Sequence, residues 1–398
     1  MQSVSCAAVG SLALLFLAAP SGPAAAADLL NSCPPLAPAV SPAGSLGEAV
    51  DTLAAREMRQ QGLPGMTIEI ARRGVPLYVR AYGYADLASC RPAQIETPYQ
   101  IGSVTKQFTA AAVLQLQQEG RIDIDRSVLT YLSGYALDPR ITVRMLLNQT
   151  SGLVDYTTLP PPPGWLNGLP ENTLLSLIVE QPLQFTPGSA YQYSNSNYFI
   201  LGAVIEAVTS VSYWEYLERH VLRRARLTHT GPVQSPLAAS PYTYTNPAVP
   251  GTTGLADGLI PDPSIFFSAG ALWSTVADLA KWDAALWDGA IISRRMFHEM
   301  VTPPPSIAPF QGAAVPAPYA MGWITQSPQA VVPVIWHNGG TLAYTAFNSL
   351  RLENGFSVSV LTNVDIQTDI PLYPFTMALI NAVCASPEGP RVCGEDGH

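Results

Sequence analysis

The chain has 398 residues, of which 48% are hydrophobic and 12% charged, a composition typical of a compact globular protein and not of a disordered one. Its formal net charge of -9 argues against a nucleic-acid partner, because phosphate binding needs a basic surface and the sequence has no basic run. This length accommodates one large domain or two interlocked lobes.

The first 27 residues have the pattern of a signal peptide. An apolar stretch at 9–19 is too short to span a bilayer, and the small residues at 25–27 form an A-x-A site. We therefore expect cleavage before Asp28 and a periplasmic or secreted protein, with no membrane segment in the mature chain. The segment before the apolar stretch lacks Lys and Arg, so an uncleaved apolar N-terminus is the alternative.

Four cysteines remain once Cys6 leaves with that peptide. An even number in an exported protein predicts two disulfides, and we favour Cys33 with Cys90 and Cys384 with Cys393. The other two pairings stay open. None of the cysteines has the spacing of a zinc site, so we expect no metal ion.

In chain order, the predicted elements begin and end with segments of one antiparallel sheet. We expect an α/β fold of the α+β type: a sheet lobe at about 28–98 and 315–398, flanked by the first and last helices, with a mostly helical lobe at about 99–314 inserted between. Together they form a single domain, 28–398, with the cleft between the lobes as the site for a small molecule. The predicted strands are 66–71, 76–84, 331–336, 344–352 and 356–362, and the predicted helices are 46–61, 107–120, 172–181, 198–210 and 372–383.

A serine and a lysine lie one helical turn apart at the start of the helical lobe. In QIGSVTKQ, residues 100–107, Ser103 falls at or just before a helix N-terminus and Lys106 follows three residues later. Lysine occurs only twice in the chain, at Lys106 and Lys281. A buried lysine can lose its proton, whereas arginine stays charged, so Lys106 can act as the base that activates Ser103. The alternative is an N-cap serine beside a solvated lysine.

These residues resemble the Ser-x-x-Lys motif of serine β-lactamases and penicillin-binding proteins. The segment FTPGSAYQYSNSNYFILG, at 185–202, is similar to the part of class C β-lactamases and D-alanyl-D-alanine carboxypeptidases that carries Tyr-x-Asn, here Tyr193-Ser194-Asn195. Other similar stretches occur in the family's order at 146–153, 268–282, 319–323 and 337–344. The resemblance covers nearly all of the mature chain and implies a β-lactamase/transpeptidase-like fold.

The resemblance also implies the catalytic roles. Ser103 is the expected nucleophile, and Lys106 with Tyr193 the base system that takes its proton and later protonates the leaving group. Which of the two holds the proton in the free enzyme stays open. Asn195 is expected to bond Lys106 and the substrate, unless it is a turn or cap residue.

The oxyanion hole is expected to use the N–H groups of Ser103 and of Gly340, which follows Gly339. The alternative for these glycines is a strand end that tolerates a close backbone approach.

The sequence departs from the family at His337-Asn338-Gly339. β-Lactamases of this family have Lys-Thr-Gly there, whereas related esterases and D-amino-acid peptidases often have this His-Asn-Gly pattern. Histidine is largely neutral at pH 7, so recognition of a β-lactam carboxylate is expected to be weak. His337 can instead donate to Tyr193 or tune Lys106, and a histidine that merely fills the strand end is the alternative.

Two further segments carry weaker expectations. The proline-rich loop at 155–170 includes Tyr156 and Trp165, which line an acyl or leaving-group pocket or else belong to a plain surface loop, the interpretation we favour. The segment 282–289 is predicted to be an amphipathic helix that packs its tryptophans.

The sequence thus predicts an exported serine hydrolase that forms an acyl-serine intermediate with an ester or a D-amino-acid-type peptide amide. It needs no metal and no organic cofactor, and its partner is a small-molecule or peptide substrate. The rivals are a class C-like β-lactamase or D,D-carboxypeptidase, and a noncatalytic binding protein of the same fold. Natural substrate, deacylation rate and oligomeric state stay open.

Overall fold

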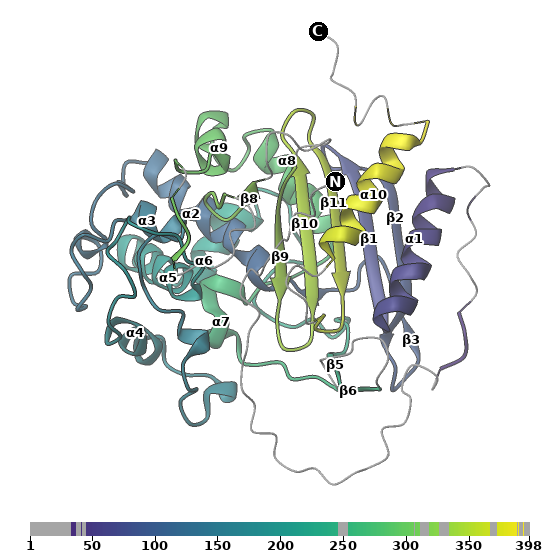
Figure 1. Cartoon of the computed structure of the whole chain (residues 1–398), viewed down its shortest axis with the longest axis horizontal. Helices are drawn as coiled ribbons and strands as arrows, with labels where there is room; N and C mark the ends of the chain where they lie inside the picture. The colour runs from purple at the N-terminus through teal and green to yellow at the C-terminus, as the bar shows by residue number, and fades with distance from the viewer. Residues whose placement is uncertain are drawn as a thin grey trace.

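The computed structural model describes residues 33–36, 41, 45–245, 254–305, 307–310, 318–325, 334–366, 372–387, 389 and 393. The predicted signal peptide lies outside these residues. Figure 1 shows a sheet with helices beside it on one side of the molecule and a group of mostly helical segments on the other.

The sheet has seven strands and joins the two ends of the chain. Strand β1 pairs with β2 on one side and with β11 on the other, so that Met66 lies opposite Thr362. This arrangement confirms the predicted fold class, in which both ends of the chain build one antiparallel sheet. The order across the sheet is β3 (Arg91–Pro92), β2 (Val75–Asp86), β1 (Gly65–Arg72), β11 (Phe356–Thr362), β10 (Thr345–Arg351), β9 (Ile335–Gly340) and β8 (Ile324–Thr325).

Strand β9 differs from its prediction. Part of the predicted range, 331–333, lies outside the described residues, and the strand continues to Gly340 instead of ending at Trp336. Asn338 pairs with Phe347 of β10, and Gly339 with Ala346, so the ladder holds residues of low strand propensity in extended form. The sequence placed these residues after the strand, and the structure places them within it.

Helices cover both faces of the sheet. Helices α1 (Leu46–Gln61) and α10 (Tyr373–Ala385) pack against each other and against β2 and β11, while α8 (Val276–Trp287) packs on β1 and β11 (Figure 1). Both favoured disulfides are present: Cys33–Cys90 ties the segment before α1 to the β2–β3 turn, and Cys384–Cys393 closes the end of α10.

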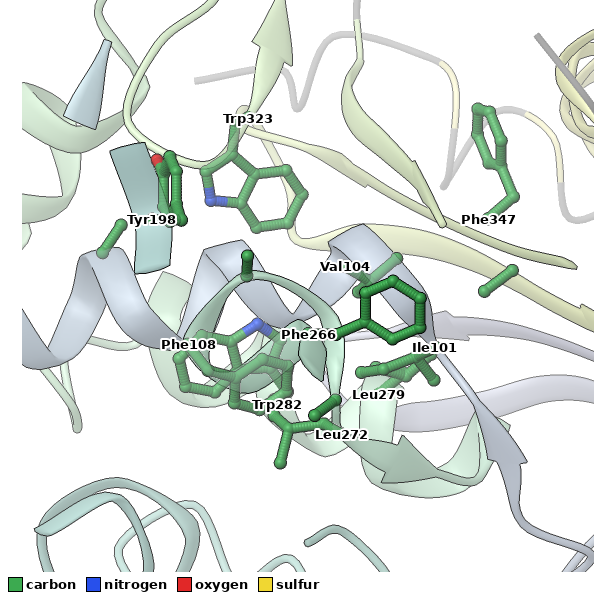
Figure 2. Close-up of a cluster of buried hydrophobic side chains, with 14 of the residues drawn as sticks. Ile101, Val104, Phe108, Tyr198, Phe266, Leu272, Leu279, Trp282, Trp323 and Phe347 are labelled. Carbon is green, nitrogen blue, oxygen red and sulfur yellow. The ribbon is translucent and has the colours of Figure 1, made fainter. Parts of the chain in front are cut away.

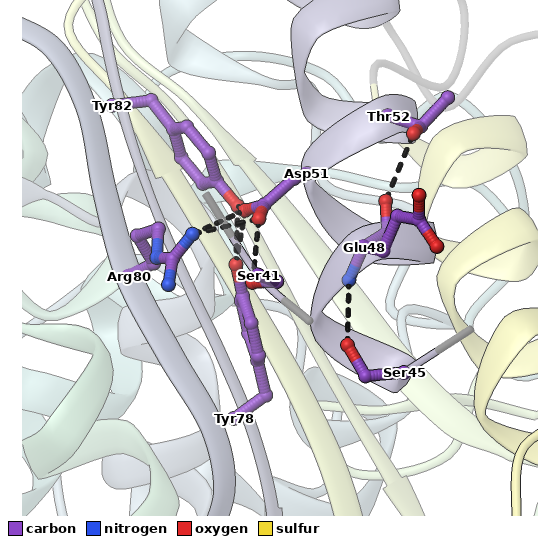
Figure 3. A network of polar contacts seen from close by, with 8 residues as sticks. All are labelled: Ser41, Ser45, Glu48, Asp51, Thr52, Tyr78, Arg80 and Tyr82. Carbon is purple, nitrogen blue, oxygen red and sulfur yellow. Dashed lines mark hydrogen bonds and ion pairs between the residues drawn. The ribbon is translucent and has the colours of Figure 1, made fainter. Parts of the chain in front are cut away.

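A polar cluster fastens α1 to β2. Asp51 accepts hydrogen bonds from the hydroxyls of Tyr78 and Tyr82 and pairs with Arg80 at 2.7 Å (Figure 3). Ser45 caps the helix by accepting the N–H of Glu48. The cap explains why α1 begins where the sequence predicts, and the cluster holds the helix against β2.

The helical part of the chain is built around α2 (Thr105–Gln118), whose residues from Thr105 to Leu116 are all buried. A helix that is buried all round suits the run of small and apolar residues in AAAVLQL. The other elements here are η2 (Gly102–Val104), η3 (Val128–Thr130), α3 (Val143–Leu147), η4 (Tyr156–Thr158), η5 (Trp165–Asn167), α4 (Glu171–Val179), α5 (Asn195–Thr209), α6 (Tyr213–Leu217), η6 (Glu218–Leu222), α7 (Pro263–Gly270), α9 (Arg294–Val301) and the strand pairs β4 (Tyr99–Gln100) with β7 (Trp273–Ser274) and β5 (Tyr242–Tyr244) with β6 (Leu255–Asp257).

Aromatic packing joins α2 to α8. Phe108 stacks on Trp282 with ring centroids 4.0 Å apart, and both side chains are fully buried (Figure 2). The indole N–H of Trp282 donates to Gln107 at 3.2 Å, so its polar atom is satisfied within the core. The predicted helix is present as the end of α8, with Trp282 packed in the core and Trp287 half-buried. None of the helices among the described residues combines the length and the apolar character that a membrane span requires.

Glu69 lies on β1 on the face that α8 covers, with only 4% of its surface exposed. Burial raises the pKa of its carboxyl to about 7 from 4.5, partly offset by Lys281. The folded state therefore holds this proton more tightly than the unfolded chain does. The resulting contribution to stability is fully present below pH 4.5 and is lost as the pH rises through about 7.

We therefore expect Glu69→Gln to raise the free energy of unfolding at pH 8 by up to about 3 kcal/mol relative to wild type, with little effect at pH 4.5. Urea unfolding at the two pH values measures this difference. Glu119→Gln, a change at an exposed carboxylate, serves as the control, and an equal gain at both pH values for Glu69→Gln would contradict the expectation.

Candidate active site

Ser103 lies in η2, immediately before α2, as the sequence predicts. Its hydroxyl does not cap the helix: the N-cap of α2 is Val104, and no side chain bonds there. Instead Ser103 Oγ lies 2.9 Å from Lys106 Nζ and 2.8 Å from the hydroxyl of Tyr193. The interpretation of Ser103 as a capping serine is wrong.

Lys106 is fully buried, which excludes a solvated first-turn lysine. Its Nζ contacts three acceptors: Ser103 Oγ, Asn195 Oδ1 at 2.8 Å and the carbonyl oxygen of Ala269 at 2.7 Å. Burial lowers the pKa of Lys106 to about 7, and the negative charge of Asp155 partly offsets this effect. A neutral amine has two N–H groups, and when Asn195 and Ala269 accept them the lone pair is left facing Ser103 Oγ.

A strained turn presents the Ala269 carbonyl. Phe267, inside α7, has φ 39° and ψ -131°, a conformation that costs a non-glycine residue about 1–3 kcal/mol. Its ring is held by edge and tilted contacts with Phe199, Tyr213 and Trp214. This packing fixes the backbone turn, and the turn directs the Ala269 carbonyl oxygen at the amine of Lys106.

Tyr193 directs its hydroxyl at Ser103 from the segment before α5. Burial and the neighbouring Tyr319 raise the pKa of Tyr193 well above its ordinary value, so it keeps its proton at neutral pH. The hydroxyl therefore donates to Ser103 Oγ. The ring of Tyr193 also lies 4.9 Å from Lys106 Nζ, within the range of a cation–π contact.

Asn195 is the first residue of α5, and its side-chain amide is fixed at both ends. Its Nδ2 donates to Asp155 Oδ2 at 3.0 Å and to Thr157 Oγ1 at 3.3 Å, which leaves Oδ1 for Lys106. The side chain of Gln149 accepts the N–H of Ser194 at 3.0 Å and so holds this segment in place.

The roles of Asp155 and Gln149 were not predicted from the sequence. Gln149 lies within the family-like stretch at 146–153, and Asp155 is the first residue of the proline-rich loop at 155–170.

Glycines let η2 approach β9 closely. Gly102 has φ +49°, and a Cβ there would lie 2.8 Å from the backbone nitrogen of Gly340. A Cβ at Gly339 would lie 1.9 Å from the carbonyl oxygen of Ile101 and 3.2 Å from the nitrogen of Ser103.

The Thr341 N–H donates to the Tyr344 carbonyl, and ladder bonds alternate along an antiparallel strand. The N–H of Gly340 therefore points away from β10 and toward η2. The backbone nitrogens of Ser103 and Gly340 thus meet at one junction.

His337 lies on β9 with its side chain fully buried. Its Nδ1 lies 2.6 Å from the Asn338 carbonyl, so Nδ1 carries the proton and Nε2 accepts the hydroxyl of Tyr319 at 3.1 Å. Burial and the charge of Lys106 lower the pKa of His337 to about 3, so its ring is neutral. Its bonding partner is thus Tyr319, in the YAMGW stretch, and not Tyr193, whose ring centroid is 6.1 Å away.

The loop after α3 contributes to the site through a residue that was not predicted. Tyr156 is buried and its hydroxyl donates to the Ile265 carbonyl, while Trp165 is half-buried in η5. It is Asp155, next to Tyr156, that contacts Asn195, the partner of Lys106. Among the described residues, no three His, Cys, Asp or Glu side chains form a group suited to a metal ion.

This geometry agrees with the comparisons to known proteins. A family model described as Beta-lactamase matches residues 50–374. The chain belongs to the Beta-lactamase family. The Ser103–Lys106–Tyr193 cluster lies within the matched range.

Three similar proteins give this family assignment its context. The putative penicillin-binding protein PbpX of Bacillus subtilis is 29% identical over 79% of this chain and 72% of its own length. Protein flp of Staphylococcus aureus is 26% identical over 80% of this chain, which spans 63% of the length of that relative. The solved structure of a D-stereospecific amidohydrolase from Streptomyces sp. superposes with a TM-score of 0.69 at 28% identity, over 84% of this chain and 96% of that chain.

The glycine contacts predict different effects for two alanine substitutions in β9. Gly339→Ala should push β9 away from η2, because its Cβ would clash with the Ile101 carbonyl oxygen at 1.9 Å. We expect a loss of stability of about 1–3 kcal/mol. Gly340→Ala, where a Cβ would meet no atom within 4 Å, should keep the wild-type melting temperature. Thermal unfolding compares the two variants, and equal melting temperatures would contradict the close packing of η2 against β9.

Proposed function

We propose that this protein is an exported serine hydrolase that works through an acyl-serine intermediate. The observation that carries the proposal is the contact of Lys106 Nζ with Ser103 Oγ at 2.9 Å, in a fully buried site where the lysine pKa is lowered to about 7. Such an amine is neutral often enough at physiological pH to take the serine proton. A noncatalytic binding protein would not need this arrangement.

In the proposed reaction, Ser103 Oγ attacks the substrate carbonyl carbon while its proton passes to Lys106. The N–H groups of Ser103 and Gly340 stabilise the oxyanion that forms. As the intermediate collapses, Tyr193 donates its proton to the departing alcohol or amine, and the proton held by Lys106 replaces it. Water then attacks the acyl-serine, and the same groups act in reverse order.

For the substrate class, we propose an ester or a D-amino-acid-type amide. His337 is neutral and buried where β-lactamases of the family carry a lysine, so this position supplies no cation for a β-lactam carboxylate. The amide option is supported by the likeness to the D-stereospecific amidohydrolase. The likeness to PbpX keeps a penicillin-reactive enzyme as the second candidate. Export is supported by the two disulfides and by the signal-like pattern of residues 1–27.

The acyl-serine itself can be observed by time-resolved intact mass measurement. The mature protein is mixed separately with a short-chain p-nitrophenyl ester and with benzylpenicillin, while released product is recorded. We expect rapid ester turnover and a slow or absent penicillin adduct, with no adduct and a loss of at least about 10³-fold in kcat/KM for Ser103→Ala. A penicillin adduct that forms and clears quickly would favour the β-lactamase alternative, and unchanged turnover in Ser103→Ala would overturn the nucleophile.

The role of Lys106 predicts a pH profile. Because only the neutral amine accepts the serine proton, kcat/KM should rise with pH through a midpoint near 7. With two lysines in the chain, lysine labelled with ¹³C at Cε gives two signals, and the signal of Lys106 should titrate with the same midpoint.

Lys106→Arg should be inactive but folded, whereas Lys281→Arg, at an exposed lysine that pairs with Asp278, should be active. A Lys106 signal that titrates near pH 10 would contradict the base assignment.

A further inference from the structure

The carboxylate of Asp155 connects the loop after α3 to the catalytic cluster. Its Oδ1 accepts the backbone N–H of Thr157 at 3.0 Å and the Thr157 hydroxyl at 2.8 Å, which caps η4. Its Oδ2 accepts the side-chain amide of Asn195 at 3.0 Å. Burial raises the pKa of Asp155, whereas the Thr157 hydrogen bonds and the charge of Lys106 oppose that rise. Each of its partners donates a hydrogen, so the site is built for an ionised carboxylate.

A side-chain amide has one donor end and one acceptor end, and these contacts decide which end faces Lys106. With Nδ2 of Asn195 held by the carboxylate, only Oδ1 is left to accept from Lys106. The reverse orientation would aim an N–H group at the lysine amine. We propose that Asp155 is a positioning residue of the active site. Its carboxylate fixes the orientation of the Asn195 amide, and its negative charge acts on the amine of Lys106.

The electrostatics of the cluster agree with this assignment. The groups that face Lys106 from other elements are the rings of Tyr193 and Tyr198, at 4.9 and 5.7 Å, and His337 on β9. Burial raises the pKa of both tyrosines well above the ordinary value and lowers that of His337 to about 3, so all three are neutral at pH 7. Within the described part of the chain, Asp155 is thus the charged group that acts on Lys106.

The two effects on Lys106 have opposite signs. Burial lowers the lysine pKa and Asp155 raises it, so the carboxylate keeps the amine from becoming too weak a base to deprotonate a serine. Asp155 would then contribute both geometry, through Asn195, and basicity, through its charge. This inference rests on the proposed function of Lys106 as the base.

Asp155→Asn tests both contributions. It keeps an Oδ1 that can cap η4 but removes the charge and places an amide donor against the donor end of Asn195. We expect the Lys106 Cε signal and the acidic limb of kcat/KM to shift to lower pH by about one unit or more. The plateau of kcat/KM should fall by about 10- to 100-fold.

A matched control is Asp123→Asn. Asp123 accepts the N–H of Asp125 at 3.0 Å, the same local contact that Asp155 makes, but it lies beyond the far end of α2. At 1.5 Å per residue, the end of that helix is about 18 Å from Lys106. This control should keep the wild-type midpoint and plateau.

The proposal is overturned if Asp155→Asn lowers activity at every pH without moving the Lys106 midpoint, since a structural disturbance of the loop alone would do that. Asp155→Glu is the second variant if Asp155→Asn does not fold. It keeps the charge but is too long to preserve both contacts, so the midpoint should stay while kcat falls. A lowered midpoint in this variant would contradict the charge effect, and an unchanged kcat would contradict the positioning role.

A third comparison adds Asn195→Ala to Asp155→Asn. Because Asp155 acts through Asn195, the loss in kcat should be smaller than the product of the two single losses, and a multiplicative loss would overturn the link. A failure of the proposed function looks different: the wild-type protein would then lack an acidic limb near pH 7, or Ser103→Ala would retain its activity.

Discussion

The burial of one amine determines how the rest of this site is built. Lys106 has no exposed surface, and an ammonium group there is costly to desolvate unless acceptors surround it. The fold supplies three of them, from η2, α5 and α7. Three acceptors satisfy the ammonium, and two satisfy the neutral amine, so either protonation state can exist without an orphaned donor. The proposed role of Lys106 as a base needs this property, whereas a structural ion pair does not.

The sheet makes the second part of the site, because it joins the ends of the chain. Strand β11 lies between β1 and β10, and β10 in turn pairs with β9, which packs against η2. Only residues without a Cβ fit between η2 and β9, which is why Gly102 and Gly339 face each other across this contact. Ser103, the proposed nucleophile, and the Gly340 N–H are more than 200 residues apart in sequence, yet their separation in space is set by this glycine packing.

The parts of the site that the sequence predicts are those with a local or ordered signature. Ser103 and Lys106 are one turn apart, and Tyr193 follows within a recognisable segment. Their residue types and their order were therefore enough to select them as site candidates. The Ala269 carbonyl had no such signature, because any residue has a carbonyl and its direction depends on the strained turn at Phe267.

Asp155 was missed for a related reason. A carboxylate shortly before a run of prolines has the sequence context of a surface loop residue. Its link to the site depends on the tertiary contact with Asn195, which the sequence does not show. Strand β9 was placed too early because its pairing with β10 outweighs the low strand propensity of Asn338 and the glycines.

The neutral His337, at the position where β-lactamases of the family carry a lysine, also affects the charge around Lys106. A second ammonium beside Lys106 would disfavour protonation of Lys106 and at the same time attract an anionic substrate. With a neutral His337 held by Tyr319, the cation nearest Ser103 in the described site is Lys106 itself. In the proposed reaction this charge is absent whenever Lys106 accepts the serine proton. A substrate that must be anchored by its carboxylate therefore has no permanent partner at this position. This agrees with the proposed substrate, an uncharged ester or amide, which hydrogen bonds and apolar contacts can hold.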